Sequence, residues 1–154
     1  MVTTLVVLVL ALSCKDFMIL GTENIRIPKD RVVLLRQGTN IAAVIFTKHE
    51  IRYGDPPRDY AEYDWMFRND GGMVLEKEHP SVQSGSAETT GAHPWVAVGP
   101  FRLRWSFRTR STGWIYREPN LNVLLAITDI ESIDEKIDFD SQKYTFHSLA
   151  STKE

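Results

Sequence analysis

The chain has 154 residues, of which 43% are hydrophobic and one is a cysteine, and its formal net charge is −2. This length suffices for one sizeable core and is short for two independent domains. The near-neutral charge excludes a global field that attracts nucleic acid, and the lone cysteine excludes an internal disulfide and any zinc cluster of several cysteines. We therefore expect a single domain with no nucleic-acid partner.

An apolar run between Val2 and Leu12 precedes Ser13 and Cys14. Its core of about eight to ten residues has the length of a signal-peptide hydrophobic region, whereas a membrane-spanning helix needs roughly 18 residues. Two charged residues follow directly, and each costs about 2.5 to 3.5 kcal/mol at the centre of a membrane. We therefore interpret residues 1–13 as an export signal.

The segment Leu-Ala-Leu-Ser-Cys at positions 10–14 resembles the signal of bacterial lipoproteins, in which a small residue precedes a cysteine that becomes lipidated and N-terminal after cleavage. Ser13 and Cys14 match this pattern, whereas the two residues before them reverse the usual order and no Lys or Arg precedes the apolar run. The resemblance implies a membrane anchor at Cys14, a short linker up to residue 24, and a place in the cell envelope, membrane-anchored, periplasmic or extracellular. The alternative is a buried strand of a cytosolic protein, because periodicity alone does not type a short apolar run.

Residues 25–148 carry strand and turn signals and are expected to form one β-rich domain. Residues 25–27 alternate as a first strand. The aliphatic runs 31–36 and 41–47 predict a hairpin, since the four residues between them include a glycine that readily adopts positive φ.

A loop with two consecutive prolines, residues 53–57, separates this hairpin from a second one. There, the aromatic residues of segment 63–68 alternate with other side chains, and an Asn-Asp-Gly-Gly turn leads into residues 73–75. A helix from Asp59 is the competing interpretation, which the aromatic content disfavours. Residues 79–94 are rich in small and polar side chains and predict an exposed, mobile loop.

The clearest strand signal covers residues 101–108. The alternation separates apolar from mainly basic positions, namely Phe101, Leu103, Trp105 and Phe107 on one face and Arg102, Arg104, Ser106 and Arg108 on the other. A turn then leads into a strand at 114–116, and the apolar run 123–127 is expected to be central in a sheet.

The C-terminal part is ambiguous. A capping box at Thr128 predicts a short helix with inward-facing isoleucines at 130, 133 and 137, while the alternation around Phe139 predicts a strand. Residues 144–146 are expected to be the last strand. So many short strands predict a mainly β fold, either an antiparallel β-sandwich or a partly open barrel.

Two sets of side chains are candidates for ligand binding. Arg102, Arg104 and Arg108 share one strand face and predict an anion site, because guanidinium groups make paired bonds to anionic groups. The alternative is that this strand lies beside the acidic stretch 129–140 and forms ordinary cross-strand ion pairs. Trp95 and Trp114 are the tryptophans expected to be exposed and to stack on a ligand, whereas the tryptophan in the apolar phase of segment 101–108 is expected in the core.

The sequence contains no complete catalytic, metal or cofactor motif. His49 and Glu50 are adjacent on an expected strand and so point to opposite faces. His79 and His93 flank the expected loop, but no third metal ligand is indicated. We therefore predict no catalytic residue, no metal and no cofactor.

Two classes of function follow. The first is a noncatalytic envelope lipoprotein that binds an envelope protein or a glycan, or that serves as a structural component. The second is a small exported hydrolase or metal-dependent enzyme, which requires a concave pocket that joins His79 or His93 to acidic groups.

The lipid anchor is testable by replacing Cys14 with Ser, which removes the thiol that accepts the lipid. Intact-mass analysis and detergent-phase partitioning of the expressed protein should show a lipid-sized mass increment and membrane association, both absent from Cys14→Ser. An unsubstituted protein that keeps Met1 and stays in the soluble cytoplasmic fraction would contradict the export interpretation.

Overall fold

A computed structural model describes residues 24–28, 30–92, 94–109, 112–117 and 123–148. The expected export signal and Cys14 lie outside the described residues. The described residues form strands and turns and contain no helix. The strands are β1 (Asn24–Pro28), β2 (Val32–Gln37), β3 (Asn40–Arg52), β4 (Arg58–Arg68), β5 (Val74–Leu75), β6 (Gln83–Gly91), β7 (Trp95–Val98), β8 (Phe101–Thr109), β9 (Thr112–Arg117), β10 (Leu124–Ile127), β11 (Ile137–Asp138) and β12 (His147–Ser148).

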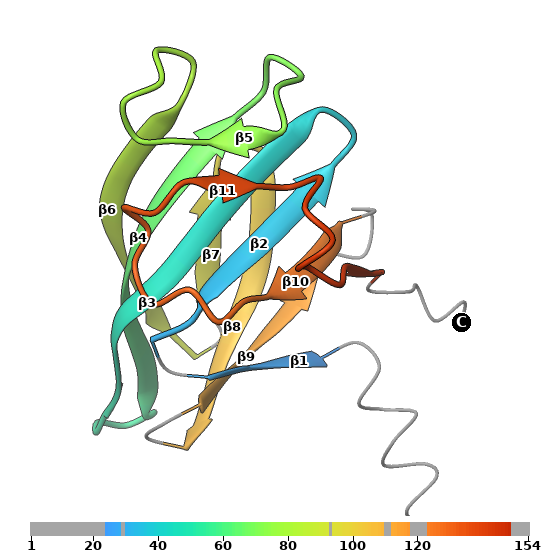
Figure 1. The fold of residues 1–154 in the computed structure, drawn as a ribbon. Helices are drawn as coiled ribbons and strands as arrows, with labels where there is room; N and C mark the ends of the chain where they lie inside the picture. The colour runs from blue at the N-terminus through green and yellow to red at the C-terminus, as the bar shows by residue number, and fades with distance from the viewer. Residues whose placement is uncertain (1–23, 29, 93, 110–111, 118–122, 149–154) are drawn as a thin grey trace, which may run out of the picture.

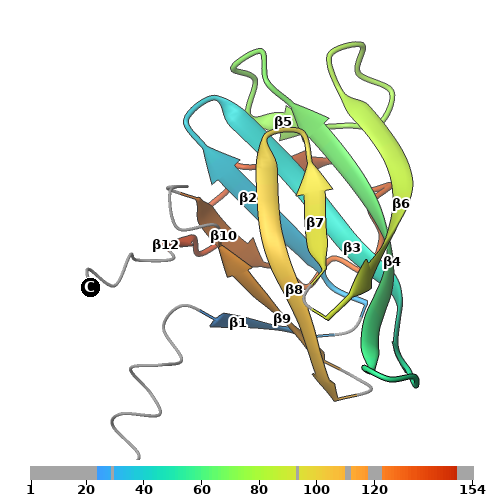
Figure 2. The ribbon, with the colours of Figure 1, turned by 180° about the vertical axis from the view of Figure 1, so that it is seen from behind.

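Two antiparallel sheets lie face to face (Figures 1 and 2). One has the strand order β1-β9-β8-β7, and the other has the order β12-β10-β2-β3-β4-β6. A third, two-stranded sheet of β5 and β11 crosses the opposite face of the six-stranded sheet (Figure 1). The expected mainly β, antiparallel fold is confirmed, and the sheets stack like a sandwich without closing into a barrel.

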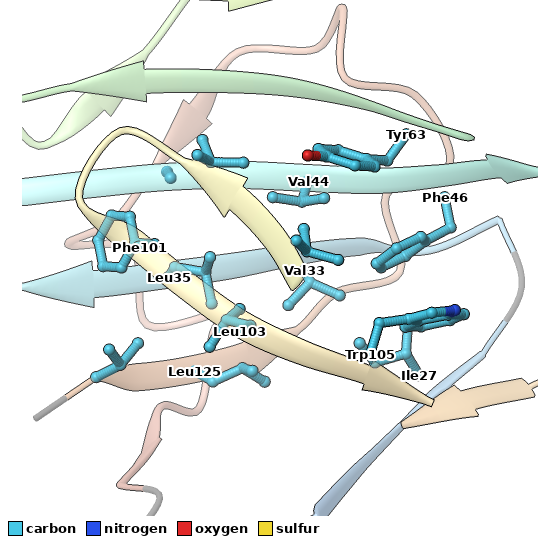
Figure 3. Close-up of a cluster of buried hydrophobic side chains, with 14 of the residues drawn as sticks. Ile27, Val33, Leu35, Val44, Phe46, Tyr63, Phe101, Leu103, Trp105 and Leu125 are labelled. Carbon is cyan, nitrogen blue, oxygen red and sulfur yellow. The ribbon is translucent and has the colours of Figure 1, made fainter. Parts of the chain in front are cut away.

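The space between the two large sheets holds the first hydrophobic core (Figure 3). The indole of Trp105 on β8 stacks on Phe46 of β3, with ring centroids 4.1 Å apart and an interplanar angle of 19°. The β7–β8 turn approaches the six-stranded sheet closely, because Gly99 has a φ of 53° and a Cβ there would stand 2.8 Å from the Phe67 ring. The inward-facing side chains of both sheets fill the space between them and exclude solvent from this first core.

The other face of the six-stranded sheet carries a second core. Val32, Leu34 and Ile45 on β2 and β3 point into it and are almost fully buried. The C-terminal segment covers them with buried Ile137 and Phe139, helped by four partly buried residues, Ile130, Ile133, Tyr144 and Phe146. Residues 32–35 of β2 and 41–46 of β3 are all apolar, as expected for strand segments that are covered on both faces.

The helix predicted from Thr128 is wrong. Its hydroxyl accepts a hydrogen bond from the Ile130 N–H (3.1 Å) and donates one to the Val32 carbonyl (3.0 Å). The Val32 N–H in turn donates to the Ile130 carbonyl at 3.0 Å. These bonds tie the segment to the start of β2, so Ile130 and Ile133 reach the core from an irregular chain, while Ile137 reaches it from strand β11.

The second predicted hairpin is also wrong, since β4 pairs with β6 and β5 pairs with β11. Arg68 forms an ion pair with Asp70 and donates to the Val74 carbonyl (2.9 Å), while Asp70 accepts the Gly72 N–H. These contacts turn the chain away from β4 before β5 begins. The competing helix from Asp59 is likewise excluded, because β4 is a strand paired on both edges.

Residues 79–94 contain strand β6 and are not the mobile loop predicted from their composition. The main chain of β6 pairs with β4 from Gln83 to Gly91, and its side chains are mostly exposed, as expected. An outer strand needs main-chain partners more than apolar side chains, so composition alone does not reveal it.

Two C-terminal expectations also need correction. Strand β10 is nearly at the sheet edge, because only the two-residue β12 lies beyond it. The last strand begins at His147 and not at residue 144, since Tyr144 and Phe146 instead pack against the second core.

Replacing Phe139 by Ala should lower the free energy of unfolding by about 3 to 5 kcal/mol, because its ring is 2% exposed and stacks on Phe146. Chemical denaturation measures this, with Phe139→Leu as a milder variant in case the alanine variant does not fold. Leu124→Ala is the control and should cost no more than about 0.5 kcal/mol, because Leu124 is 37% exposed. Equal small losses for all three variants would contradict the packing of the C-terminal segment on the sheet.

Candidate functional site

The candidate anion-binding arginines lie on the outer face of the four-stranded sheet. Arg102 and Arg104 on β8 are exposed, whereas Phe101, Leu103 and Trp105 between and beside them are buried. The alternation predicted for this part of the strand is confirmed. The face is turned away from the first core and toward solvent (Figure 2).

Trp95 lies beside Arg104 on the neighbouring strand β7. The two residues are direct cross-strand partners, and the guanidinium carbon of Arg104 is 5.0 Å from the centroid of the Trp95 ring. Trp95 remains 41% exposed, as the sequence indicated. Register places Tyr116 of β9 on the other side of Arg104. The fold therefore joins two candidates that the sequence had assigned to separate kinds of ligand.

Strand β7 is held in place by side chains of the six-stranded sheet. The Tyr63 hydroxyl donates to the Ala97 carbonyl (3.2 Å) and accepts the Ala97 N–H (3.3 Å). The Thr89 hydroxyl donates to the Trp95 carbonyl at 2.9 Å. These bonds connect the two sheets, so the Trp95 backbone is fixed relative to the arginines beside it.

Arg102 and Arg104 have no ion-pair partner among the described residues. The alternative prediction, that the acidic stretch 129–140 neutralises them, is wrong. That stretch lies across the far face of the six-stranded sheet (Figure 1) and pairs there with other cations. The pairs are Arg31 with Glu131 (2.6 Å), Lys77 with Asp134 (2.7 Å) and Arg36 with Asp140 (3.6 Å).

The roles predicted for Cys14, Arg108 and Trp114 stay predictions. Cys14 lies outside the described residues, and only the backbone of Arg108 and Trp114 is described. Register pairs Trp114 with Ser106 on β8, next to the row of Arg104.

A second polar cluster, which sequence reasoning missed, surrounds Tyr60 on the outer face of β3, β4 and β6. The Tyr60 hydroxyl lies 2.7 Å from Glu62 Oε1 and 2.9 Å from Glu88 Oε2. The Arg52 guanidinium carbon stands 3.5 Å from the centre of the Tyr60 ring, and Lys48 pairs with Glu62 at 3.5 Å. We call these five residues the Tyr60 cluster.

The signal for this cluster was the polar alternation after residue 47. A β-bulge between Phe46 and Lys48 shifts the register, so that Phe46 enters the core while Lys48 and Arg52 face outward. His49 points the other way and meets the Trp105 ring edge-on at 5.8 Å. His49 and Glu50 therefore face opposite sides of the sheet, as predicted.

The single proton of the Tyr60 hydroxyl is shared with two carboxylates. Its hydrogen bond to Glu62, and then that to Glu88, raises the pKa of Tyr60 to about 12. The same hydroxyl, with Lys48 nearby, lowers the pKa of Glu62 below its ordinary value. Such bonds stabilise the charged carboxylate and the neutral phenol together.

A hollow of about 340 Å³ adjoins the cluster, and Glu62, Asp64 and Glu88 contribute to its lining. His79 does not line it, and instead accepts the Ser81 N–H at its Nδ1 (3.1 Å). His93 lies outside the described residues. Within the described part of the chain, no group of three His, Cys, Asp or Glu side chains is arranged to hold a metal ion.

Comparison with protein-family models, with curated proteins and with solved structures found no match. Among the described residues, no helix has the length and apolar character needed to cross a membrane.

Replacing Glu62 by Gln should lower the pKa of Tyr60 from about 12 toward its ordinary value of 10, because the stronger of its two charged acceptors becomes neutral. Since the pKa is raised in the folded protein, this contact contributes stability below about pH 10 and loses it as the pH rises toward 12. Tyrosinate absorbance, with Tyr60→Phe as the reference that identifies the Tyr60 signal, measures the change.

The control is Glu78→Gln, which neutralises an exposed glutamate outside the Tyr60 cluster and should leave the titration of Tyr60 unchanged. A Tyr60 that already titrates near pH 10 in the unsubstituted protein would show that the two hydrogen bonds do not form in solution.

Proposed function

We propose that this chain is an exported, noncatalytic binding module of the cell envelope, anchored through Cys14, and that it binds an acidic glycan. The binding residues are Trp95, Arg102 and Arg104. The single observation that carries this proposal is an exposed indole beside two arginines that have no carboxylate partner among the described residues.

The chemistry of these side chains fits an acidic sugar. An indole presents an apolar face on which a sugar ring stacks, and a guanidinium group makes paired, charge-assisted hydrogen bonds to carboxylate or sulfate. The cation–π contact between Arg104 and Trp95 contributes about 0.5 to 1 kcal/mol at an exposed site, so a ligand can displace it at modest cost.

The spacing of the arginines favours a chain-like ligand over a single small anion. Arg102 and Arg104 are two positions apart on one strand, which separates their Cα atoms by roughly 6.8 Å. Neither residue lines the described hollow beside the Tyr60 cluster. An open sheet face of this kind suits an extended polymer that carries repeated acidic groups.

Placement in the envelope is supported by the resemblance of residues 10–14 to a lipoprotein signal. An anchor at Cys14 precedes β1 by a short linker, so the β-domain would face the space in which envelope glycans occur. The lining of the hollow beside the Tyr60 cluster contains no histidine, and His79 accepts the Ser81 N–H elsewhere.

Replacing Arg102 and Arg104 together by Ser should weaken binding to dextran sulfate and polygalacturonate by roughly tenfold or more, because each lost charge-assisted hydrogen bond contributes about 1.5 to 3 kcal/mol before screening by salt. Isothermal titration at two salt concentrations measures this. Trp95→Ala should weaken polygalacturonate binding and abolish any fluorescence change on binding that comes from this indole.

Arg58→Ser is the matched control, because Arg58 is also exposed and has no ion pair among the described residues but lies on β4, away from Trp95. It should leave polyanion binding unchanged, and neutral dextran should not compete. An equal loss of polyanion affinity in Arg58→Ser would show that binding depends only on the net charge of the protein. Unchanged polyanion binding when Arg102 and Arg104 are both replaced by Ser would show that this face is not the binding site.

A further inference from the structure

Ala97 is the small residue among the large described side chains on the outer face of β7 and β8. Two of the four side chains of β7 are buried, and the other two, Trp95 and Ala97, are exposed. Ala97 is the direct cross-strand partner of Arg102, and Trp95 is the partner of Arg104. Both strands lie at the front of the molecule in Figure 2. A methyl group is thus surrounded by an indole and two guanidinium groups on an open sheet face.

The main chain of Ala97 is held from the other sheet. Its C=O accepts a hydrogen bond from the Tyr63 hydroxyl (3.2 Å), and its N–H donates to the same hydroxyl (3.3 Å). Because these groups turn away from β8, Ala97 and Arg102 form a non-hydrogen-bonded pair, in which the Cα atoms are about 4.5 Å apart. The Trp95 carbonyl also turns outward and accepts the Thr89 hydroxyl at 2.9 Å. The backbone beneath this part of the face is therefore fixed before any ligand arrives.

The two arginines differ in their surroundings. The guanidinium carbon of Arg104 stands 5.0 Å from the centre of the Trp95 ring, whereas Arg102 faces only the methyl group of Ala97 across the strand pair. Trp95 and Arg102 are diagonal neighbours, whose Cα atoms are roughly 7 to 8 Å apart. Since Ala97 carries no side chain beyond Cβ, a ligand can approach the sheet here more closely than over the large residues beside it.

We propose that one uronate unit of the acidic glycan lies over Ala97, with its ring against the Trp95 indole and its carboxylate bonded to Arg102. This Ala97 subsite, formed by Trp95, Ala97 and Arg102, rests on the proposed function and names the sugar unit that the face selects. A uronate carries an apolar ring face for the indole and a carboxylate for the guanidinium on a single unit. Ala97 is then a specificity-determining residue, because a larger side chain at this position excludes the ring.

The test fills position 97 without a change of charge, and isothermal titration of the full-length protein with polygalacturonate measures the affinity. Ala97→Leu should weaken binding by about tenfold or more, because its side chain occupies the place of the sugar ring. Ala97→Val should cause a smaller loss, and Ala97→Ser should bind within about twofold of the unsubstituted protein. Ser84→Leu is the matched control, since it adds the same side chain at an exposed position of β6 in the other sheet.

Salt dependence separates this steric effect from a loss of charge. Ala97→Leu keeps both arginines, so its affinity should fall with salt as steeply as that of the unsubstituted protein. Replacing Arg102 and Arg104 together by Ser should make the dependence on salt shallower. Circular dichroism of each variant checks that the fold is retained, and Ala97→Val replaces the leucine variant if that variant does not fold.

The outcomes distinguish the subsite from the proposed function. If Ala97→Leu binds normally while the double arginine variant does not, the Ala97 subsite is overturned and the proposed function stands. Equal losses in Ala97→Leu and Ser84→Leu also overturn the subsite, because bulk at position 97 is then not the cause. An unsubstituted protein that does not bind polygalacturonate at all overturns both.

Discussion

The structure depends on the burial of the β2–β3 hairpin on both faces. Side chains of β2 alternate between the two cores, with Val33 and Leu35 in the first and Val32 and Leu34 in the second. A strand pair that is apolar on both sides exposes too much surface unless two further layers cover it. The four-stranded sheet supplies one cover, and the C-terminal segment with β5 and β11 supplies the other.

This layering decides where charge reaches the surface. The acidic residues of the C-terminal cover are exposed, and three of them form ion pairs with Arg31 just before β2, Arg36 on β2 and Lys77 after β5. No described segment covers the outer face of the four-stranded sheet, so Arg102 and Arg104 are exposed without a described carboxylate beside them. The proposed binding surface is thus the outer side of a sheet whose inner side is required for the core.

Irregular positions adjust this arrangement locally. The bulge after Phe46 keeps that ring in the core while it turns the following charged residues outward, where they surround Tyr60. The tie between Tyr63 and the main chain of Ala97 fixes β7 to the six-stranded sheet, and with it the backbone of Trp95. The bulge thus positions the Tyr60 cluster, and the Tyr63–Ala97 hydrogen bonds position the strand that carries Trp95.

The sequence by itself determined the features that depend on neighbouring residues. The strict alternation from Phe101 to Trp105 identified a strand and the face that its arginines occupy, because side-chain direction repeats every two residues. The glycine between the two aliphatic runs identified the first hairpin, because glycine readily adopts the positive φ of a tight turn. Pairing between distant segments was decided only by the tertiary structure. Strand β6 lacks an apolar pattern because its partner binds the main chain, and the hydroxyl of Thr128 found Val32 in place of a helix. The row of Trp95 and Arg104, and the separation of the arginines from the acidic stretch, likewise follow from strand order, which no local pattern records.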